Sequence, residues 1–512
     1  MRCALDLELF ATTFFAHYCR HPYNQYHLDY FKGFKFGERK FRRARSAPRG
    51  YAKSTIATLI KPIHDVCYGL ESFIVIFSNT QPQANGKLKD IRNEILFNAS
   101  LIRIYGVKFP TSKPGETEFI VSCRGKKTMY KAVGAGTEIR GIRFNENRPS
   151  KLVFDDIEHS EEVENEEIRV KYENWFSDVA AKIGDENTSF EFGGTILHSE
   201  SLLKKLLKNP SYDAKSYKAI ESWADRTDLW EQWKSLYVNI DNDARIEEAK
   251  TFFEANKEEM MKGVKVLWPE KEPYYDLQIE IIEHGMRSFM KEKQGEPVAS
   301  DSQVFQDMHW YRETDKGILI ESSNTLIPWD QIKFAAYGVL DPATGKRKAQ
   351  SMGDFTCILT GFKDPKGRLL VHKDYTRRES PSKWMDQIFT LHDTFKYNKF
   401  GVEENLYKEL LLPNLKDKRE RLEKERGQLI KLPFYEINQV VNKAERITAI
   451  EPKVSHGWIV FNRNLSDEFK SQMANYPNVS HDDCPDSVEM LYNLVNNRYK
   501  ASPVSLSPNK GR

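Results

Sequence analysis

The chain has 512 residues, which is too long for one ordinary hydrophobic core and predicts roughly two to four domains. Its 77 Lys and Arg against 74 Asp and Glu leave a net charge of +3, so the whole chain has no general attraction to polyanions and any nucleic-acid surface must be local. Its six cysteines are scattered without a Cys-x-x-Cys pair, which argues against a zinc site or a disulfide framework, and no apolar run approaches the ~20 residues of a membrane span, so we expect a cytosolic protein.

Residues 1–200 alternate helical and strand-like segments, as an α/β sheet with crossover helices requires. Within them a basic stretch with almost no acid is interleaved with phenylalanines. It predicts either a local nucleic-acid surface or a solvated basic face. Its cations are Lys32, Lys35, Arg39, Lys40, Arg42, Arg43, Arg45, Arg49 and Lys53.

Residues 47–55 have the pattern of a phosphate-binding loop in which Ala47 and Ala52 take the positions of the two signature glycines. The chemistry of such a loop is retained, since Lys53 can reach β- and γ-phosphate oxygens and the Ser54 hydroxyl can ligate Mg²⁺. The helix expected after the loop would add backbone N–H groups and a dipole that favour phosphate. The alternative is a basic turn before a helix.

An apolar strand over 151–154 ends in Asp155-Asp156, the second element that a phosphate loop needs. Successive side chains alternate across a strand, so one carboxylate can face the metal and the next the attacking water. Asp156 is a shorter base than the usual Glu, and Glu158 is the reserve candidate. The alternative is a strand that runs into an acidic, solvated helix.

Phosphoryl transfer also needs a cation for the charge that develops on the phosphate. Arg49 is the candidate within the loop, while Arg140 and Arg143 could act in the same subunit or reach a neighbouring one. A polar segment, Gly193–His198, follows another strand pattern and is a weak candidate for a phosphate sensor.

The character of the chain changes to helix from about residue 200 to 300, and strand patterns return from about Phe334. We expect these strands at 335–340, 356–362, 368–372, 400–403 and 458–461. The Ser- and Pro-rich tail after Lys500 is expected to be disordered.

Acidic residues follow three elements of the C-terminal third: Asp341 with a possible helper Asp354, then Glu403, then the group Asp482, Asp483 and Asp486. Each alone is more typical of a helix cap or a turn. Together they match the layout by which an RNase H-like nuclease holds two metal ions across a scissile phosphate.

With these motifs the chain resembles the large subunit of a tailed-bacteriophage terminase, a DNA-packaging motor and nuclease. The resemblance extends from about residue 15 to 500. It is carried by segments 48–55, 139–141, 148–149 with 155–156, 194–195, 268–269, 289–292, 341–343, 403–405, 442–447 and 481–486. Ala52 in place of Gly and Asp156 in place of Glu depart from the family pattern.

The resemblance implies an α/β fold with an N-terminal P-loop (ASCE-type) ATPase domain over 1–215, a helical linker or lid over 216–325, an RNase H-like nuclease domain over 326–500 and a disordered tail over 501–512. It implies Thr195 in the segment that couples hydrolysis to movement, and Lys443 on a DNA phosphate. ATP would be bound by Arg49, Gly50, Tyr51, Ala52, Lys53, Ser54, Thr55 and Asp155. Metal would be held by Ser54 and Asp155 in the first domain, and in the second by Asp341, Glu403 and one or more of Asp482, Asp483 and Asp486.

The same resemblance implies ATP with Mg²⁺ as cofactors, Mn²⁺ being possible at the nuclease site. It implies double-stranded DNA, a portal protein and a small terminase subunit as partners, and a ring of about five subunits on the procapsid. The expected location is the host cell cytoplasm, transiently at the portal vertex.

Two other functions are compatible with these motifs. A repair or recombination ATPase-nuclease would use the same two sites, although the sequence contains no recognisable base-reading module and no second helicase-like motor. A catalytically silent capsid or DNA-binding scaffold would have no need for acids at Asp341, Glu403 and Asp483.

Overall fold

The structure is a computed structural model that describes residues 2–111, 113–297, 303–332, 335–342, 355–403, 412–439, 441–497 and 502–503. The chain divides into two compact units. The N-terminal unit comprises 1–227, 257–281 and 286–299, and the C-terminal unit comprises 228–256, 282–285 and 300–512. The segment 216–325, expected to be a linker, is therefore divided between the two units, and helices α11 (Arg245–Met260) and α12 (Tyr274–His284) cross the division.

The N-terminal unit is built on a seven-stranded sheet in the order β3-β4-β2-β5-β6-β1-β7. Every pairing in it is parallel except that of the edge strand β3 with β4. Its strands are β1 (Arg42–Ser46), β2 (Phe73–Ser78), β3 (Glu118–Cys123), β4 (Lys126–Gly134), β5 (Lys151–Asp155), β6 (Ser189–Gly194) and β7 (Asp213–Ser216). Because β6 lies between the phosphate-loop strand β1 and the acidic strand β5, the sheet confirms the predicted ASCE-type arrangement.

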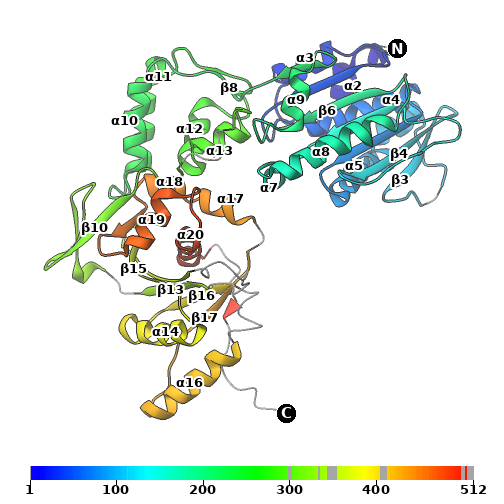
Figure 1. The fold of residues 1–512 in the computed structure, drawn as a ribbon. Coiled ribbons are helices and arrows are strands. Elements are labelled where there is room, and N and C mark those ends of the chain that lie inside the picture. Colours follow the sequence, from blue (N-terminus) through cyan, green and yellow to red (C-terminus); the bar gives the residue numbers. More distant parts are fainter. Residues whose placement is uncertain are drawn as a thin grey trace. The chain divides into compact units, whose positions relative to one another are not determined.

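Helices cover both faces of this sheet, and the alternation of side chains along β2 explains why (Figure 1). Ile74 and Ile76 pack into one apolar cluster with helices α2, α4 and α5, whereas Val75 and Phe77 pack into another with α8 and α9. The helices are α1 (Arg2–Leu5), α2 (Leu7–Phe14), α3 (Gln25–Lys32), α4 (Lys61–Tyr68), α5 (Gln81–Phe97), α6 (Ala99–Tyr105), α7 (Ser160–Val163), α8 (Glu166–Asp178), α9 (Leu202–Lys208) and α13 (Met286–Glu292), with the π-helix η2 (Thr55–Ile60) and the short 3₁₀-helices η1 (Ala16–Tyr18) and η3 (Ala180–Lys182). A two-stranded sheet pairs β8 (Ile220–Ser222) with β9 (Lys265–Val266).

The C-terminal unit contains a ten-stranded sheet in the order β12-β11-β10-β18-β15-β14-β13-β16-β17-β19. Its strands are β10 (His309–Thr314), β11 (Gly317–Ile320), β12 (Thr325–Pro328), β13 (Ala336–Asp341), β14 (Thr356–Lys363), β15 (Leu369–Arg377), β16 (Lys399–Glu403), β17 (Phe434–Ile437), β18 (Ile459–Asn462) and β19 (Ser502–Pro503). Strand β14 is antiparallel to β13 and β15, while β13, β16 and β17 are parallel. The order β15-β14-β13-β16-β17 confirms the predicted RNase H-like core.

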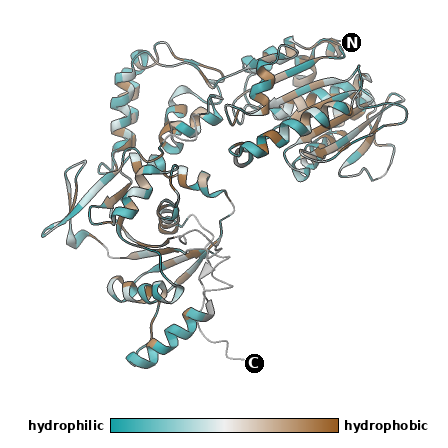
Figure 2. Cartoon of the chain, in the orientation of Figure 1, coloured by the Kyte–Doolittle hydropathy of each residue, from teal (hydrophilic) through white to brown (hydrophobic). Residues whose placement is uncertain are grey.

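Both faces of this second core are apolar, and the strands within it are hydrophobic (Figure 2). Leu340 packs with α14 on one face, and its neighbour Val339 packs with α20 on the other. The helices are α10 (Thr227–Val238), α14 (Pro381–Phe395), α16 (Leu412–Arg426), α17 (Lys443–Thr448), α18 (Glu451–Ser455), α19 (Asp467–Asn475) and α20 (Asp483–Val495), with the short turn η4 (Trp329–Gln331).

The strands expected in the C-terminal third are present as β13, β14, β15, β16 and β18. The hairpins β10–β12 and the strand β17 were not predicted. Of the tail after Lys500, residues 502–503 form β19 beside β17, and the rest lies outside the described residues. Among the helices that the structure describes, none combines the length and apolar character of a membrane span.

Candidate functional site

The loop 47–54 joins the carboxyl end of β1 to η2 and wraps around the Lys53 side chain. Lys53 is 5% exposed, and its Nζ donates to the Ala47 carbonyl oxygen at 2.9 Å, to the Pro48 carbonyl oxygen at 3.0 Å and to Thr195 Oγ1 at 3.1 Å. Burial lowers the pKa of Lys53, while the charges of Asp156 and Asp155 act to raise it. The structure thus brings Lys53 and Thr195, both predicted site residues, into direct contact.

The alanine at position 52 adopts the conformation that a glycine would take. Ala52 has φ of +55° and Gly50 has φ of +83°, both in the left-handed region. An L-residue there costs roughly 1–2 kcal/mol. The glycine-like path of the loop is therefore kept without the glycine.

The acid at the end of β5 meets the loop as predicted from the sequence. Ser54 Oγ donates to Asp155 Oδ1 at 3.0 Å, and Asp155 is 1% exposed. A hydroxyl and a buried carboxylate at this separation are oxygen donors of the kind that Mg²⁺ prefers, so the pair fits the implied metal.

A cation that the sequence did not reveal also reaches this acid. Lys87 Nζ, from α5, lies 2.6 Å from Asp155 Oδ2. Burial alone would lower the pKa of Lys87, but the charge of Asp155 outweighs it and the pKa is raised.

The two candidate bases, Asp156 and Glu158, are placed differently. Asp156 is exposed at the edge of the sheet, its φ is +47°, and its backbone N–H donates to the Gly193 carbonyl oxygen at 3.1 Å. Glu158 Oε1 accepts from the Leu202 N–H at 2.7 Å and its Oε2 accepts from the Leu203 N–H at 3.0 Å. Both oxygens of Glu158 thus cap helix α9, whereas Asp156 remains exposed, and the choice of base between them stays a prediction.

Of the three candidate cations, Arg49 is placed differently from Arg140 and Arg143, which are both exposed between β4 and β5. Arg49 NH1 lies 3.3 Å from Glu292 Oε1 at the end of α13, and the Arg49 N–H donates to the Glu292 carbonyl oxygen at 3.0 Å. Arg140 is exposed between β4 and β5 and makes no side-chain hydrogen bond or ion pair with another described residue. Only Arg49 is thus held beside the loop.

The segment after β9 braces the outside of the loop. Lys271 Nζ donates to the Gly50 carbonyl oxygen and lies 5.4 Å from the centre of the Tyr51 ring and 5.1 Å from that of Trp268. His27 Nε2 donates to the Tyr51 carbonyl oxygen at 2.9 Å. These contacts engage the Gly50 and Tyr51 carbonyl oxygens and hold the loop from its outer side.

Within the basic stretch before the loop some cations are paired or buried inside the protein, whereas Lys32, Lys35, Arg39, Lys40 and Arg42 are exposed, so the choice between a nucleic-acid surface and a solvated basic face stays a prediction. Arg43 pairs with Glu38 at 2.5 Å, Arg45 pairs with Asp213 at 2.5 Å, and Lys53 is buried in the loop. Their charges are satisfied internally and add little to an external field.

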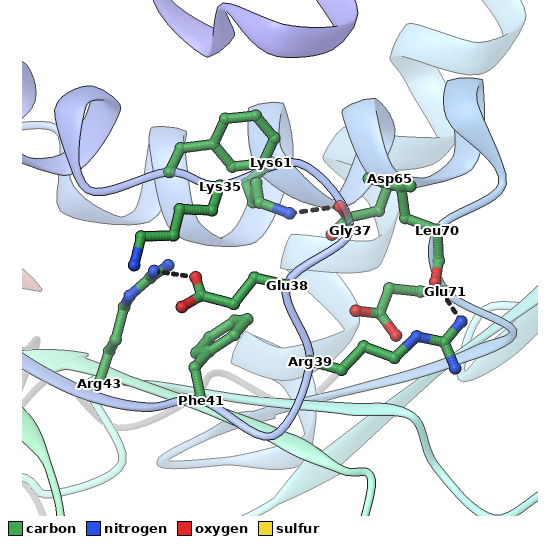
Figure 3. Close-up of a pocket in the computed structure, with 11 residues that line it drawn as sticks. Lys35, Gly37, Glu38, Arg39, Phe41, Arg43, Lys61, Asp65, Leu70 and Glu71 are labelled. Carbon is green, nitrogen blue, oxygen red and sulfur yellow. Dashed lines mark hydrogen bonds and ion pairs between the residues drawn. The ribbon is translucent and has the colours of Figure 1, made fainter.

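A cavity elsewhere in the N-terminal unit is lined by part of this stretch and by α4 (Figure 3). Lys61 pairs with Asp65 one turn further along α4, and Arg39 donates to the Leu70 carbonyl oxygen at 3.2 Å. Behind it, the buried Lys151 Nζ lies 3.2 Å from Asp65 Oδ2 and 3.3 Å from Glu191 Oε2. Apart from Lys35, Arg39 and Arg43 of the basic stretch and their aromatic neighbours Phe34 and Phe41, the lining includes no predicted site residue, and we regard it as part of a structural ion-pair network.

The acids of the C-terminal unit gather around Lys443, at the start of α17. Lys443 Nζ lies 2.9 Å from Asp482 Oδ1, 3.2 Å from Asp486 Oδ2 and 3.6 Å from Asp341 Oδ2. Burial alone would lower the pKa of Lys443, but the charges of Asp341 and Asp486 outweigh it and the pKa is raised. The centre is therefore arranged to hold a cation.

The remaining predicted acids act on the same centre. Burial raises the pKa of Asp341 well above its usual value, Lys443 opposes this, and Asp486, Asp483 and Glu403 add to it. Burial and the charge of Asp486 also raise the pKa of Glu403. Arg446, which the sequence pointed to only as part of a motif, lies 3.1 Å from Asp486 Oδ1 through its NH1.

The carboxylates are directed at the Lys443 ammonium more than at one another. Over the residues that the structure describes, no group of three or more His, Cys, Asp or Glu side chains is placed so that it could hold a metal ion. Their carboxylate oxygens are donors of the kind that Mg²⁺ and Mn²⁺ prefer, and the metal assignment stays a prediction. Asp354, the possible helper, lies outside the described residues.

No protein-family model matches this sequence, and no curated protein matches it either. Among solved structures, the large terminase from the thermophilic bacteriophage D6E is similar with a TM-score of 0.46 and 10% identity, covering 93% of this chain and 100% of that one. The HK97 bacteriophage large terminase gives a TM-score of 0.28 and 11% identity, covering 88% of this chain and 91% of that one. The human cytomegalovirus terminase nuclease domain gives 0.27 and 15%, covering 36% of this chain and 92% of that one. The structures named here that resemble the chain over most of its length are thus large terminases of bacteriophages.

Proposed function

We propose that this chain is a terminase large subunit, which hydrolyses ATP to move double-stranded DNA into a procapsid and cuts concatemeric DNA with a metal-dependent endonuclease. The observation that carries the ATPase half is the hydrogen bond between Ser54 and Asp155, which joins loop and strand acid on either side of β6. The nuclease half is supported by a separate acidic centre on an RNase H-like core.

In the ATPase, Lys53 would exchange the carbonyls of its own loop for phosphate oxygens. Because the same ammonium holds Thr195 Oγ1, phosphate binding would release Thr195 from Lys53. That exchange supplies a direct route from nucleotide binding to the coupling segment. Ser54 and Asp155 would hold Mg²⁺, which supplies charge neutralisation at the phosphates.

Two further residues complete the proposed ATP site. Asp156 would orient the attacking water, since it is the acid of the pair that remains exposed. Arg49 would supply positive charge, since it is held beside the loop by Glu292 and could turn inward when that ion pair breaks.

In the nuclease, Asp341, Glu403, Asp483 and Asp486 would hold the metal ions, with Asp482 at the rim. These ions would supply a nucleophile and stabilise the leaving oxygen of the phosphodiester. Lys443 would then be free to steady a DNA phosphate, because the metal ions would take over its present carboxylate partners.

The partners proposed with this function are double-stranded DNA, a portal protein, a small terminase subunit and further copies of the chain, as a ring of about five on the procapsid. The proposed location is the host cell cytoplasm and, during packaging, the portal vertex. Packaging of linear DNA into portal-bearing procapsids distinguishes this function from a repair or recombination enzyme.

A separation-of-function experiment on the full chain tests the two sites together. Lys53→Ala should lower DNA-stimulated ATP hydrolysis about 100-fold or more while plasmid cleavage in Mg²⁺ or Mn²⁺ persists. Asp341→Ala should instead lower plasmid cleavage while DNA-stimulated ATP hydrolysis persists. Lys208→Ala and Asp467→Ala, at exposed positions of α9 and α19, serve as matched controls. Hydrolysis that survives Lys53→Ala, or cleavage that survives Asp341→Ala, would show that the corresponding site lies elsewhere.

A further inference from the structure

Helix α5 brings a lysine to the acid of the proposed ATP site. It begins directly after β2, which is the neighbour of β5 in the sheet, so its first turns lie at the edge where β5 ends. Lys87 Nζ lies 2.6 Å from Asp155 Oδ2, while Ser54 uses Oδ1 of the same carboxylate. Ser54 thus donates a hydrogen bond to one oxygen of Asp155, and Lys87 forms an ion pair with the other.

The Asp155 carboxylate needs this cation when no metal is bound. It is 1% exposed and stands next to a second acid, Asp156, and a buried carboxylate without a counter-charge is strongly disfavoured. The other lysine of the site, Lys53, is held by the carbonyls of the loop and by Thr195. Lys87 is therefore the cation in contact with Asp155.

Lys87 and a metal ion cannot share Asp155 without repulsion. A metal held by Ser54 and Asp155 would lie within a few ångströms of the ammonium, and like charges at so short a distance repel strongly. The Lys87 side chain is 24% exposed, so it has room to move. Asp90, one helical turn further along α5, already attracts it electrostatically and is exposed, which provides a second partner.

We propose that Lys87 is a positioning residue that occupies Asp155 Oδ2 before the metal arrives and yields it to Mg²⁺ when the nucleotide binds, moving toward Asp90. This inference rests on the proposed ATP site. It predicts that Lys87 balances the charge of Asp155 and keeps its side chain ordered, and that it raises the Mg²⁺ concentration that nucleotide binding requires.

The test measures binding of a fluorescent, non-hydrolysable ATP analogue to the full chain at increasing Mg²⁺ concentration. Lys87→Met and Lys87→Gln should lower the Mg²⁺ midpoint about five- to tenfold, because the competing charge is removed from a partly exposed position. Lys87→Arg, which keeps the charge, should shift it less than about twofold. Lys89→Met, at an exposed neighbouring position, is the matched control and should leave it unchanged.

A further variant does not touch the site. Asp90→Ala removes the second partner from an exposed helix position, so it should fold normally and raise the midpoint about twofold. An unchanged or raised midpoint in Lys87→Gln, with normal binding in the wild type, overturns the role of Lys87. If the wild type does not bind the analogue with Mg²⁺ at all, the proposed ATP site itself is refuted, and the two failures are thus distinguishable.

Discussion

Replacing Ala52 with glycine perturbs the phosphate loop at the position where a glycine was expected. The native φ of +55° is strained for alanine and unstrained for glycine. Relief of that strain contributes roughly 1–2 kcal/mol. Against it stand the greater entropy of an unfolded glycine, about 0.4–1 kcal/mol, and the loss of a half-buried methyl, about 0.4 kcal/mol.

The balance is a net stabilisation of about 0.5 kcal/mol for Ala52→Gly. The same substitution at Ala57, five residues further along, serves as the control. Ala57 lies in η2 and is 4% exposed, so glycine there loses helix propensity and a buried methyl, together about 2 kcal/mol. The two identical substitutions should therefore differ by about 2.5 kcal/mol in free energy of unfolding.

Differential scanning calorimetry of the full chain measures this difference. The transition of the N-terminal unit is the one that moves when Mg²⁺ and a non-hydrolysable ATP analogue are added. Ala52→Gly should raise its midpoint by about 1–2 °C and Ala57→Gly should lower it by several degrees. If Ala52→Gly loses as much stability as Ala57→Gly, the left-handed conformation of residue 52 is refuted.

Two further predictions concern the buried ion pairs of the N-terminal unit. Lys151→Met removes the shared partner of Asp65 and Glu191, all three being at most 3% exposed, and should cost about 3–5 kcal/mol in urea unfolding; a loss under about 1 kcal/mol would show that the network is dispensable. Burial and the charge of Asp65 raise the pKa of Glu71 from 4.5 to about 7, so the folded protein keeps a proton that the unfolded chain releases. The contribution of protonated Glu71 to the free energy of unfolding is present below about pH 4.5 and is lost as the pH rises to about 7, a fall of about 3 kcal/mol. Glu71→Gln should abolish this fall. Equal slopes of unfolding free energy against pH for the wild type and the variant would contradict the prediction.

Much of both candidate sites was predictable because their chemistry is local in the sequence. Lys53 and Ser54 are adjacent in one motif, and Asp155, Asp341 and Glu403 each end a recognisable strand. In parallel neighbouring strands such ends share one edge of the sheet, so the pattern of strands alone brings acids toward each other. The roles of these residues in catalysis and metal binding stay proposals.

Other features depend on packing between distant segments, which no motif records. Lys87, Lys271 and Glu292 reach the proposed ATP site from three separate segments; Lys87 and Lys271 were missed, and Glu292 was noted only as part of a motif without a role. Glu158, in contrast, looked suitable by position, yet α9 packs so that its N-terminal N–H groups take both carboxylate oxygens.

The sequence alone determined which kinds of side chain stand at the end of each strand, because this depends only on the order of residues along the chain. The tertiary structure decided which charges meet. It placed Lys87 on Asp155 and Lys443 among the nuclease acids, and it neutralised Arg43 and Arg45 that looked available to DNA. The physical reason is that the energy of a buried charge depends on neighbours in space, which are set by the strand order and by the helices packed on each sheet.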